Sequence, residues 1–159
     1  MNIKDNVNLR GEVLITGVDS TTGLVTTFVN DRNLIVLNGR QKLANALFDN
    51  TGYSITGIVL GSGGTASNNP TLPYAVDPSE LTVKTPILMT GTPFTLIPDR
   101  TASPKLTYTL IIPETSFNGS SINELALMLS DNTAFAIKRF STITKSSSLS
   151  LKIVWTIYL

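Results

Sequence analysis

The sequence predicts a mainly β protein, an antiparallel β-sandwich that carries one short α-helix at about residues 39–49. The chain contains 22 threonines and 15 serines, a composition that favours strands and polar turns over helices. Apolar and polar residues alternate over Leu106–Ile112 and again over Leu151–Leu159, as in strands with one buried face. Only one segment spaces its apolar residues as a helix does. We therefore expect residues 1–159 to form a single β-sandwich domain.

Two apolar-rich runs near the beginning of the chain predict a β-hairpin. They cover Leu9–Gly17 and Leu24–Asn30, and the turn-forming residues Val18–Gly23 separate them. Asn33–Val36 then continues as a short extended piece.

The predicted helix follows directly. Asn38 is placed to cap its first turn, and Gln41 stands three residues later as the partner in a capping box. The apolar residues of the helix share one face, which we expect to pack on the sheet. They are Leu43, Ala44, Leu47 and Phe48.

A glycine-rich loop raises the question of phosphate binding. The predicted strand Ile55–Leu60 runs into the sequence G-S-G-G-T-A, which satisfies the dinucleotide pattern G-x-G-x-x-G/A. That pattern binds phosphate only when the loop opens into a helix, and Pro70 and Pro73 exclude a helix here. We therefore interpret the glycines as a structural turn, at which a core strand leaves the sheet or another backbone approaches closely.

Residues 61–85 are predicted to form a long extended loop or arm that contacts a neighbouring subunit. A connection of this length is unusual in a compact domain, and its prolines limit the entropy lost on docking. The candidate contact residues are Gly61, Gly63, Gly64, Pro70, Pro73, Tyr74 and Pro78. Short strands at Ile87–Met89 and Phe94–Ile97 are expected after it.

A second hairpin is predicted from Ile122–Leu129 and Ala134–Phe140, around the turn Asp131-Asn132. With a two-residue loop, Glu124 lies opposite Arg139, and we predict a structural ion pair between them. The same register places Ala126 opposite Ile137 and Met128 opposite Phe135.

The residue types argue against an enzyme. The chain has no cysteine and no histidine, which excludes disulfides, thiol nucleophiles, zinc-thiolate sites and Ser-His-Asp triads. The 11 acidic residues show no acid-base pair at local spacing, although a glycosidase pair of distant residues stays an unsupported alternative. Trp155, Tyr158, Phe135 and Phe140 suggest a sugar platform, but the mid-strand position of Trp155 favours the core. We expect no catalytic residue, no cofactor and no metal.

Charge and hydropathy indicate a protein that assembles with others. The formal net charge is +1, and Lys138-Arg139 is the only adjacent basic pair, so no nucleic-acid binding is expected. The N-terminus lacks a signal peptide and no run is long enough to span a membrane, which predicts synthesis in a cytoplasm and no membrane partner. Residues Lys145–Ser148 are interpreted as a solvated loop. Because charges are sparse, we expect surface to be buried in an oligomer.

The order of several segments resembles that in virion proteins of tailed bacteriophages. The resemblance covers about residues 33–159, and its motifs are "N-L-I-V-x-x-G-R-x-x-L-A", "I-T-x-I-x-V-G-x-G", "I-x-E-x-G-L-F", "x-F-A-x-x-x-F" and "I-x-K-T-x-x-x-x-L-x-x-x-W-x-I". In this chain they correspond to Asn33–Ala44, Ile55–Gly63, Ile122–Leu127, Ala134–Phe140, Ile143–Ser146 and Val154–Ile157. Ala126 departs from the pattern, because the family usually has glycine there.

The resemblance implies a non-enzymatic structural protein similar to the baseplate-attachment region of tail-collar and tail-fibre proteins. We expect it in the virion after synthesis in the host bacterial cytoplasm, with other virion proteins and itself as partners, a homo-oligomeric trimer being favoured. Because the chain ends at Leu159, we expect an adaptor, baseplate or collar component rather than a complete fibre. The alternatives are a capsid decoration protein and a receptor- or glycan-binding module at the tail tip, which would use loops such as 115–121.

Overall fold

The fold is a single antiparallel sheet with one α-helix in the part of the chain that the computed structural model describes, residues 9–49, 52–68, 86–87, 94–99 and 105–159. The strand order is β4-β3-β7-β8-β2-β1-β9-β6-β5. The elements are β1 (Arg10–Asp19), β2 (Val25–Ile35), α1 (Leu37–Asp49), β3 (Ile55–Gly61), the 3-10 helix η1 (Ala66–Asn68), β4 (Pro86–Ile87), β5 (Phe94–Asp99), β6 (Lys105–Ile112), β7 (Ser121–Leu129), β8 (Ala134–Thr144) and β9 (Leu149–Tyr158).

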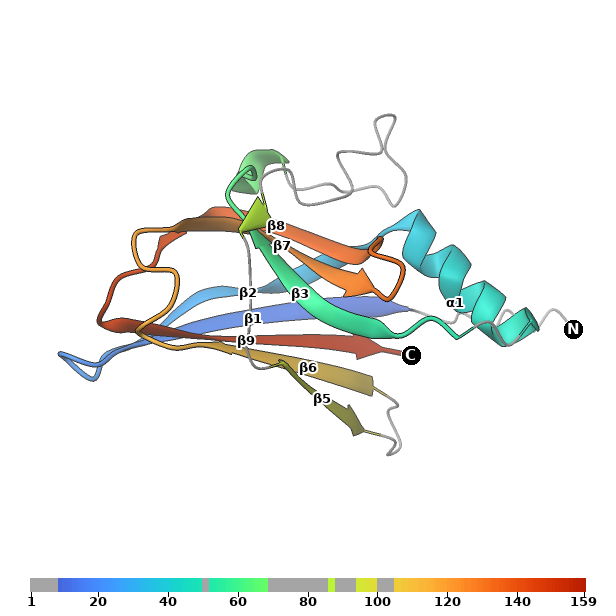
Figure 1. Cartoon of the computed structure of the whole chain (residues 1–159), viewed down its shortest axis with the longest axis horizontal. Coiled ribbons are helices and arrows are strands. Elements are labelled where there is room, and N and C mark those ends of the chain that lie inside the picture. The colour runs from blue at the N-terminus through green and yellow to red at the C-terminus, as the bar shows by residue number, and fades with distance from the viewer. Residues whose placement is uncertain (1–8, 50–51, 69–85, 88–93, 100–104) are drawn as a thin grey trace, which may run out of the picture.

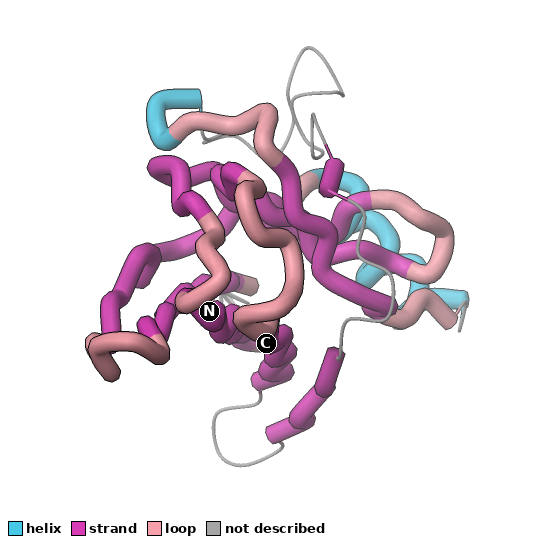
Figure 2. Tube along the Cα trace, turned by 60° about the vertical axis from the view of Figure 1, so that its left-hand side comes forward, coloured by secondary structure: helices cyan, strands magenta, loops and turns pink. Residues whose placement is uncertain are grey.

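Strand β2 joins the two halves of the sheet. Most of it pairs with β1, and its last residues, Leu34 and Ile35, pair with β8. Figure 1 shows β3, β7 and β8 lying over β1, β9 and β6, with β2 passing between the two groups. In Figure 2, which looks more nearly along the strands, they curve around a common interior.

The predicted fold class is thus confirmed in its coarser terms: mainly β, antiparallel, with one short helix. The finer expectation of a sandwich is not met clearly. The seven longer strands form a nearly closed, barrel-like sheet, because β2 is long enough to pair with both halves instead of ending in one.

The interior is filled by the alternating residues that the sequence singled out. The inward residues of β6 and β9 are buried, and they are Tyr108, Leu110, Ile112, Leu151, Ile153, Trp155 and Ile157. Trp155 is fully buried, and its indole N–H donates to Asn33 Oδ1 at 3.0 Å. The interpretation of Trp155 as a core residue is confirmed.

The β7–β8 hairpin has the predicted register in its middle, from Glu124 to Leu127, and the register shifts on both sides, between Ile122 and Glu124 and between Leu127 and Met128. Glu124 lies opposite Arg139 and Ala126 opposite Ile137, but a bulge places Met128 opposite Ala134 instead of Phe135. The turn is longer than the two residues assumed for it, and Asn132 adopts a φ of 63°. An extra residue in the ladder shifts the register toward the turn.

Helix α1 begins two residues earlier than predicted, and Asn38 does not cap it. The Asn38 side-chain amide instead donates to Thr133 Oγ1 at 2.8 Å and to the Ala134 carbonyl at 3.4 Å, which ties the helix to the β7–β8 turn. The predicted apolar face is also wrong at one end, since Phe48 is 93% exposed. The contact of Asn38 with the β7–β8 turn sets where the helix starts and therefore which of its faces meets the sheet.

The short strands expected after the predicted arm correspond to β4 and β5. β4 covers only Pro86–Ile87, and β5 extends to Asp99. Residues 88 and 89, which were expected to belong to the first of these strands, lie outside the described residues.

Helix α1 approaches β8 so closely that it requires glycine at its third residue. A Cβ atom added to Gly39 would collide with the Phe135 carbonyl, and backbone atoms have little freedom to move away. Gly57 provides a contrast, because an added Cβ would meet no atom within 4 Å.

We therefore predict that Gly39→Ala destabilises the protein by about 1–3 kcal/mol, although alanine is the better helix former. Denaturant unfolding measures the change. Gly57→Ala is the matched control and should leave the free energy of unfolding equal or slightly higher. Equal stability of the two variants would contradict the close packing of α1 on β8.

Candidate functional site

A buried ion pair lies on the outer side of the β7–β8 hairpin. Arg139 Nε is 3.3 Å from Glu124 Oε2, and both side chains are 0% exposed. Successive residues of a strand point to opposite faces, and Leu125 belongs to the core, so Glu124 points away from the core. A charged pair on an outer face stays dry only if another segment covers it.

The glycine loop is that cover. The Gly63 amide donates to Glu124 Oε1 at 2.9 Å, and the Gly64 amide donates to Asn123 Oδ1 at 2.8 Å. Arg139 Nη1 in turn donates to the Asn68 carbonyl at 3.0 Å. A glycine-loop amide of the kind that binds phosphate in nucleotide-binding proteins therefore binds the protein's own Glu124 carboxylate here, and the next amide binds Asn123.

Gly64 permits the close approach that the sequence predicted for the glycines. An added Cβ would lie 2.9 Å from Arg139 Cγ and 2.9 Å from the Asn123 carbonyl oxygen. The interpretation of this loop as a structural turn with close backbone contact is confirmed at this position.

The first part of the predicted arm is anchored to the sheet. Gly61 is the last residue of β3, and the loop after it ends in η1, where Asn68 Oδ1 accepts from the Thr65 amide at 2.7 Å. The contacts of Gly63, Gly64 and Asn68 hold residues 62–68 against β7 and β8. The remaining arm residues, Pro70, Pro73, Tyr74 and Pro78, lie outside the described residues.

Lys145 corrects the interpretation of Lys145–Ser148 as a solvated loop. Its side chain is fully buried, and Nζ donates to the Glu114 carbonyl at 3.2 Å, to Asn118 Oδ1 at 3.1 Å and to the Ser146 carbonyl at 2.8 Å. Burial lowers the pKa of the Lys145 ammonium group. The lysine thus fixes the loop that the sequence suggested for glycan recognition.

The described residues hold neither a cluster of metal ligands nor a membrane-spanning helix. Among them, no three acidic side chains gather in a way that would hold a metal ion. The same residues include no helix long and apolar enough to cross a membrane. The Glu124 carboxylate already accepts from Gly63 and Arg139, so its role in the structure is to bind the loop.

The tip of the β1–β2 hairpin is rigid. One oxygen of Asp19 accepts from the amides of Thr21 and Thr22 at 2.8 Å and 3.0 Å, and the other accepts from the Ser148 hydroxyl at 3.0 Å. These hydrogen bonds, the Thr22 amide first, lower the pKa of Asp19. Gly23 closes the turn with a φ of 70°.

The same tip is apolar. Leu24 and Val25 are 64% and 63% exposed, and Val18, which lies opposite Val25, is 41% exposed. Residues 20–28 contain no charged side chain. Figure 1 shows this hairpin extending beyond the other strands at the end opposite α1. A rigid, uncharged, apolar projection has the properties of a docking element.

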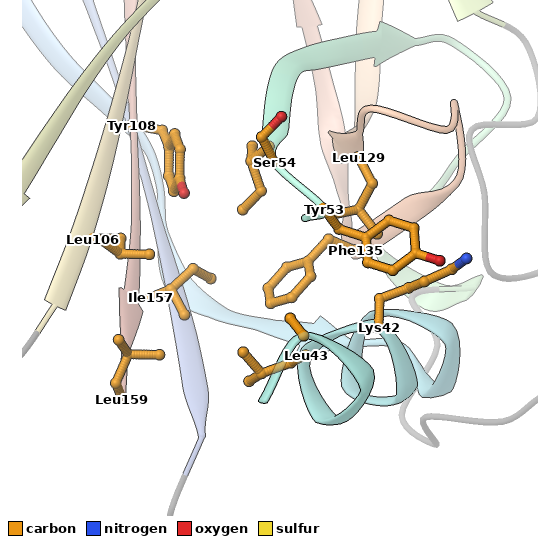
Figure 3. Close-up of a pocket in the computed structure, with 12 residues that line it drawn as sticks. Lys42, Leu43, Tyr53, Ser54, Leu106, Tyr108, Leu129, Phe135, Ile157 and Leu159 are labelled. Atoms are coloured by element: carbon orange, nitrogen blue, oxygen red, sulfur yellow. The ribbon is translucent and has the colours of Figure 1, made fainter. Parts of the chain in front are cut away.

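An apolar pocket lies where the barrel fails to close. Its volume is about 240 Å³, and Figure 3 shows two walls facing each other across it. One wall comes from β6 and β9, and the other comes from α1, the beginning of β3 and the β7–β8 hairpin. The apolar lining residues are Leu43, Ala46, Ile55, Leu106, Leu129, Phe135, Ile157 and Leu159. We call it the seam pocket.

Polar groups stand along one part of the seam pocket. Lys42 Nζ is 3.0 Å from Asp131 Oδ2 and 4.1 Å from the centre of the Tyr53 ring. On the opposite wall, burial raises the pKa of Tyr108 to about 12, so its phenol stays protonated at neutral pH. The Lys42 ammonium group is already engaged by Asp131 and by the Tyr53 ring. The pocket therefore suits an apolar group.

Comparison with known proteins adds no relative, since no family model, no curated protein and no solved structure matches this chain. The resemblance to tailed-phage virion proteins therefore stays a prediction.

Sequence reasoning found the Glu124–Arg139 pairing and the close approach of the glycine loop, and it missed the burial of Lys145, the apolar hairpin tip and the seam pocket. The predicted loop was too short, but the extra residue Phe135 in the β8 ladder offsets that error, so Glu124 still lies opposite Arg139. The seam pocket joins residues from six elements, and no local pattern marks such a set. The one available signal for the hairpin tip was the run of uncharged residues 20–28.

Removal of the charge on Glu124 should be strongly destabilising. Glu124→Gln leaves the Arg139 guanidinium buried without its counter-ion, which we expect to lower the free energy of unfolding by about 3–5 kcal/mol. The matched control is Glu12→Gln, at an exposed ion pair in which Arg10 Nη2 lies 3.9 Å from Glu12 Oε1, with an expected loss below about 1 kcal/mol. Urea unfolding of both variants measures the difference, and similar losses would contradict the role of the buried pair.

The lowered pKa of Asp131 predicts that the stability of the β7–β8 turn depends on pH. Hydrogen bonds, first from the Thr133 hydroxyl and then from Lys42, lower the pKa of Asp131 to about 2. Because the folded pKa lies below the ordinary value of 3.8, this stabilisation is present above pH 3.8 and is lost as the pH falls towards 2. Thr133→Val should raise the pKa of Asp131, as measured by NMR titration. The pKa of Asp19, held by other groups, is the internal control and should not change.

Proposed function

We propose that this protein is a non-enzymatic structural subunit of a tailed-phage particle, at the tail, baseplate, collar or fibre adaptor. It acts by self-association and by docking to other virion proteins after synthesis in the host cytoplasm. The observation that carries the proposal is the rigid apolar tip of the β1–β2 hairpin, with Leu24 64% exposed on a turn fixed by Asp19.

The tip favours docking for two physical reasons. Apolar side chains such as Leu24 and Val25 gain free energy when a partner removes them from water, about 25 cal/mol for each Å² buried. Because the Asp19 hydrogen bonds already order the turn, little conformational entropy is lost on binding. A surface of this kind suits a permanent assembly better than a reaction.

The positions of the segments that resemble tailed-phage virion proteins support the phage assignment. Strands β3, β7, β8 and β2 carry most of them and are consecutive neighbours in the sheet. The glycine motif after β3 and the glutamate motif of β7 meet directly, since the Gly63 amide donates to Glu124. Motifs that are weak one by one thus belong to one packed unit of the sheet.

A glycan-binding module at the tail tip receives less support. In the loop proposed for recognition, residues 115–121, the aromatic residue Phe117 packs against the core. Lys145 further fixes this loop through Asn118. The loop therefore lacks an exposed aromatic ring of the kind that stacks on sugars. Capsid decoration would use the same apolar tip and differs only in location on the particle.

The test is incorporation into particles. Leu24→Asp combined with Val25→Asp should reduce the amount of this protein in purified virions at least tenfold, because two charges would be buried at the docked tip. Quantitative mass spectrometry of the virions measures the amount. Ile111→Asp, at a residue 50% exposed on β6, is the matched control and should incorporate normally.

Two results would contradict the proposal. One is absence of the wild-type protein from purified virions. The other is normal incorporation of the double variant, which would remove the β1–β2 tip as the docking element. Circular dichroism of each variant shows whether the fold is kept.

A further inference from the structure

We propose that the seam pocket receives the Phe48 side chain of a second copy of this chain. The inference deepens the proposed function, because it rests on the self-association included there and names the contact that produces it. It does not depend on where the protein lies in a particle.

The pocket has the size and chemistry for a phenyl ring. Its volume of about 240 Å³ exceeds that of an apolar cavity of about 150 Å³, which is already large enough to bind benzene. Its apolar lining includes the Phe135 ring, and the Tyr53 and Tyr108 rings also border it. Aromatic rings attract one another in edge-to-face and offset arrangements, so a further ring fits among these three.

Phe48 supplies such a ring. At 93% exposure, it is the most exposed large apolar side chain among the described residues. A single exposed aliphatic residue is common on protein surfaces, but an almost fully exposed phenylalanine leaves a large apolar area in water. The same helix contributes Leu43 and Ala46 to the pocket wall, so donor and acceptor lie close together on one element.

The helix geometry indicates which kind of contact forms. A helix turns about 100° per residue, so Phe48 lies about 140° around from Leu43 and about 200° around from Ala46. The donor ring therefore points away from the pocket of its own chain. Such a contact made once per pair, head to tail, closes into a ring or extends as a filament, whereas the same contact made twice about a two-fold axis gives a closed dimer.

Two variants separate the donor from the acceptor. Phe48→Ala removes the ring, and Ala46→Phe fills the pocket from inside its own helix. Sedimentation equilibrium of the whole chain should show self-association weakened by about tenfold to a hundredfold in each variant. Ile111→Ala, which shortens another exposed apolar residue, is the control and should associate as the wild type does. Thermal unfolding checks that each variant folds, and Ser54→Phe is a second pocket-filling variant.

The decisive measurement mixes the two variants. The Ala46→Phe protein keeps the donor ring, and the Phe48→Ala protein keeps an open pocket. At a protein concentration just sufficient for the wild type to associate, each variant alone should be mainly monomeric, and an equimolar mixture should form a one-to-one dimer that grows no further.

Three results would overturn the inference: a wild-type protein that stays monomeric, a Phe48→Ala variant that associates normally, or a mixture that stays monomeric. If only pocket filling weakens association, the occupant is another group, such as residues 1–8 of the chain, and the inference is also overturned. The incorporation experiment is read separately, so the structural-subunit proposal stands or fails on its own result.

Discussion

The arrangement of the glycine loop, β7 and β8 depends on the burial of Glu124 and Arg139. Removing two charges from water costs several kcal/mol for each ion, and mutual attraction compensates only when further hydrogen bonds complete the pair. The Gly63 amide and the Asn68 carbonyl provide those hydrogen bonds. The loop must therefore lie on the sheet whenever the pair is buried. This requirement fixes the point at which the chain leaves β3.

The two ends of the molecule present different apolar features. One end carries the rigid apolar tip of the β1–β2 hairpin, and the other carries the seam pocket beside α1. A β-sheet that nearly closes but leaves a gap produces such a pocket as a consequence of its geometry. Apolar surface at both ends agrees with the proposed role as a subunit that assembles with others.

How far the sequence predicted the structure differs between local and distant features. The alternation in β6 and β9 placed Trp155 correctly, and the register of β7 and β8 placed Glu124 opposite Arg139. The start of α1 was wrong because Asn38 bonds to Thr133, 95 residues away in the chain. The prediction that Lys145 is solvated was wrong because its three oxygen partners gather only when the loops before β7 and after β8 meet. Neither contact produces a periodic pattern in the amino-acid sequence.

By itself, the sequence determined the β class, the strand positions and the failure of the glycine loop as a phosphate site, since each follows from side-chain period, turn residues or proline sterics. Only the tertiary structure decided that the sheet is nearly closed, because β2 pairs with both β1 and β8. Only the tertiary structure also showed that the anion bound by the Gly63 amide is the Glu124 carboxylate. A carboxylate and an amide separated by 61 residues in the chain meet only when the strands between them have paired.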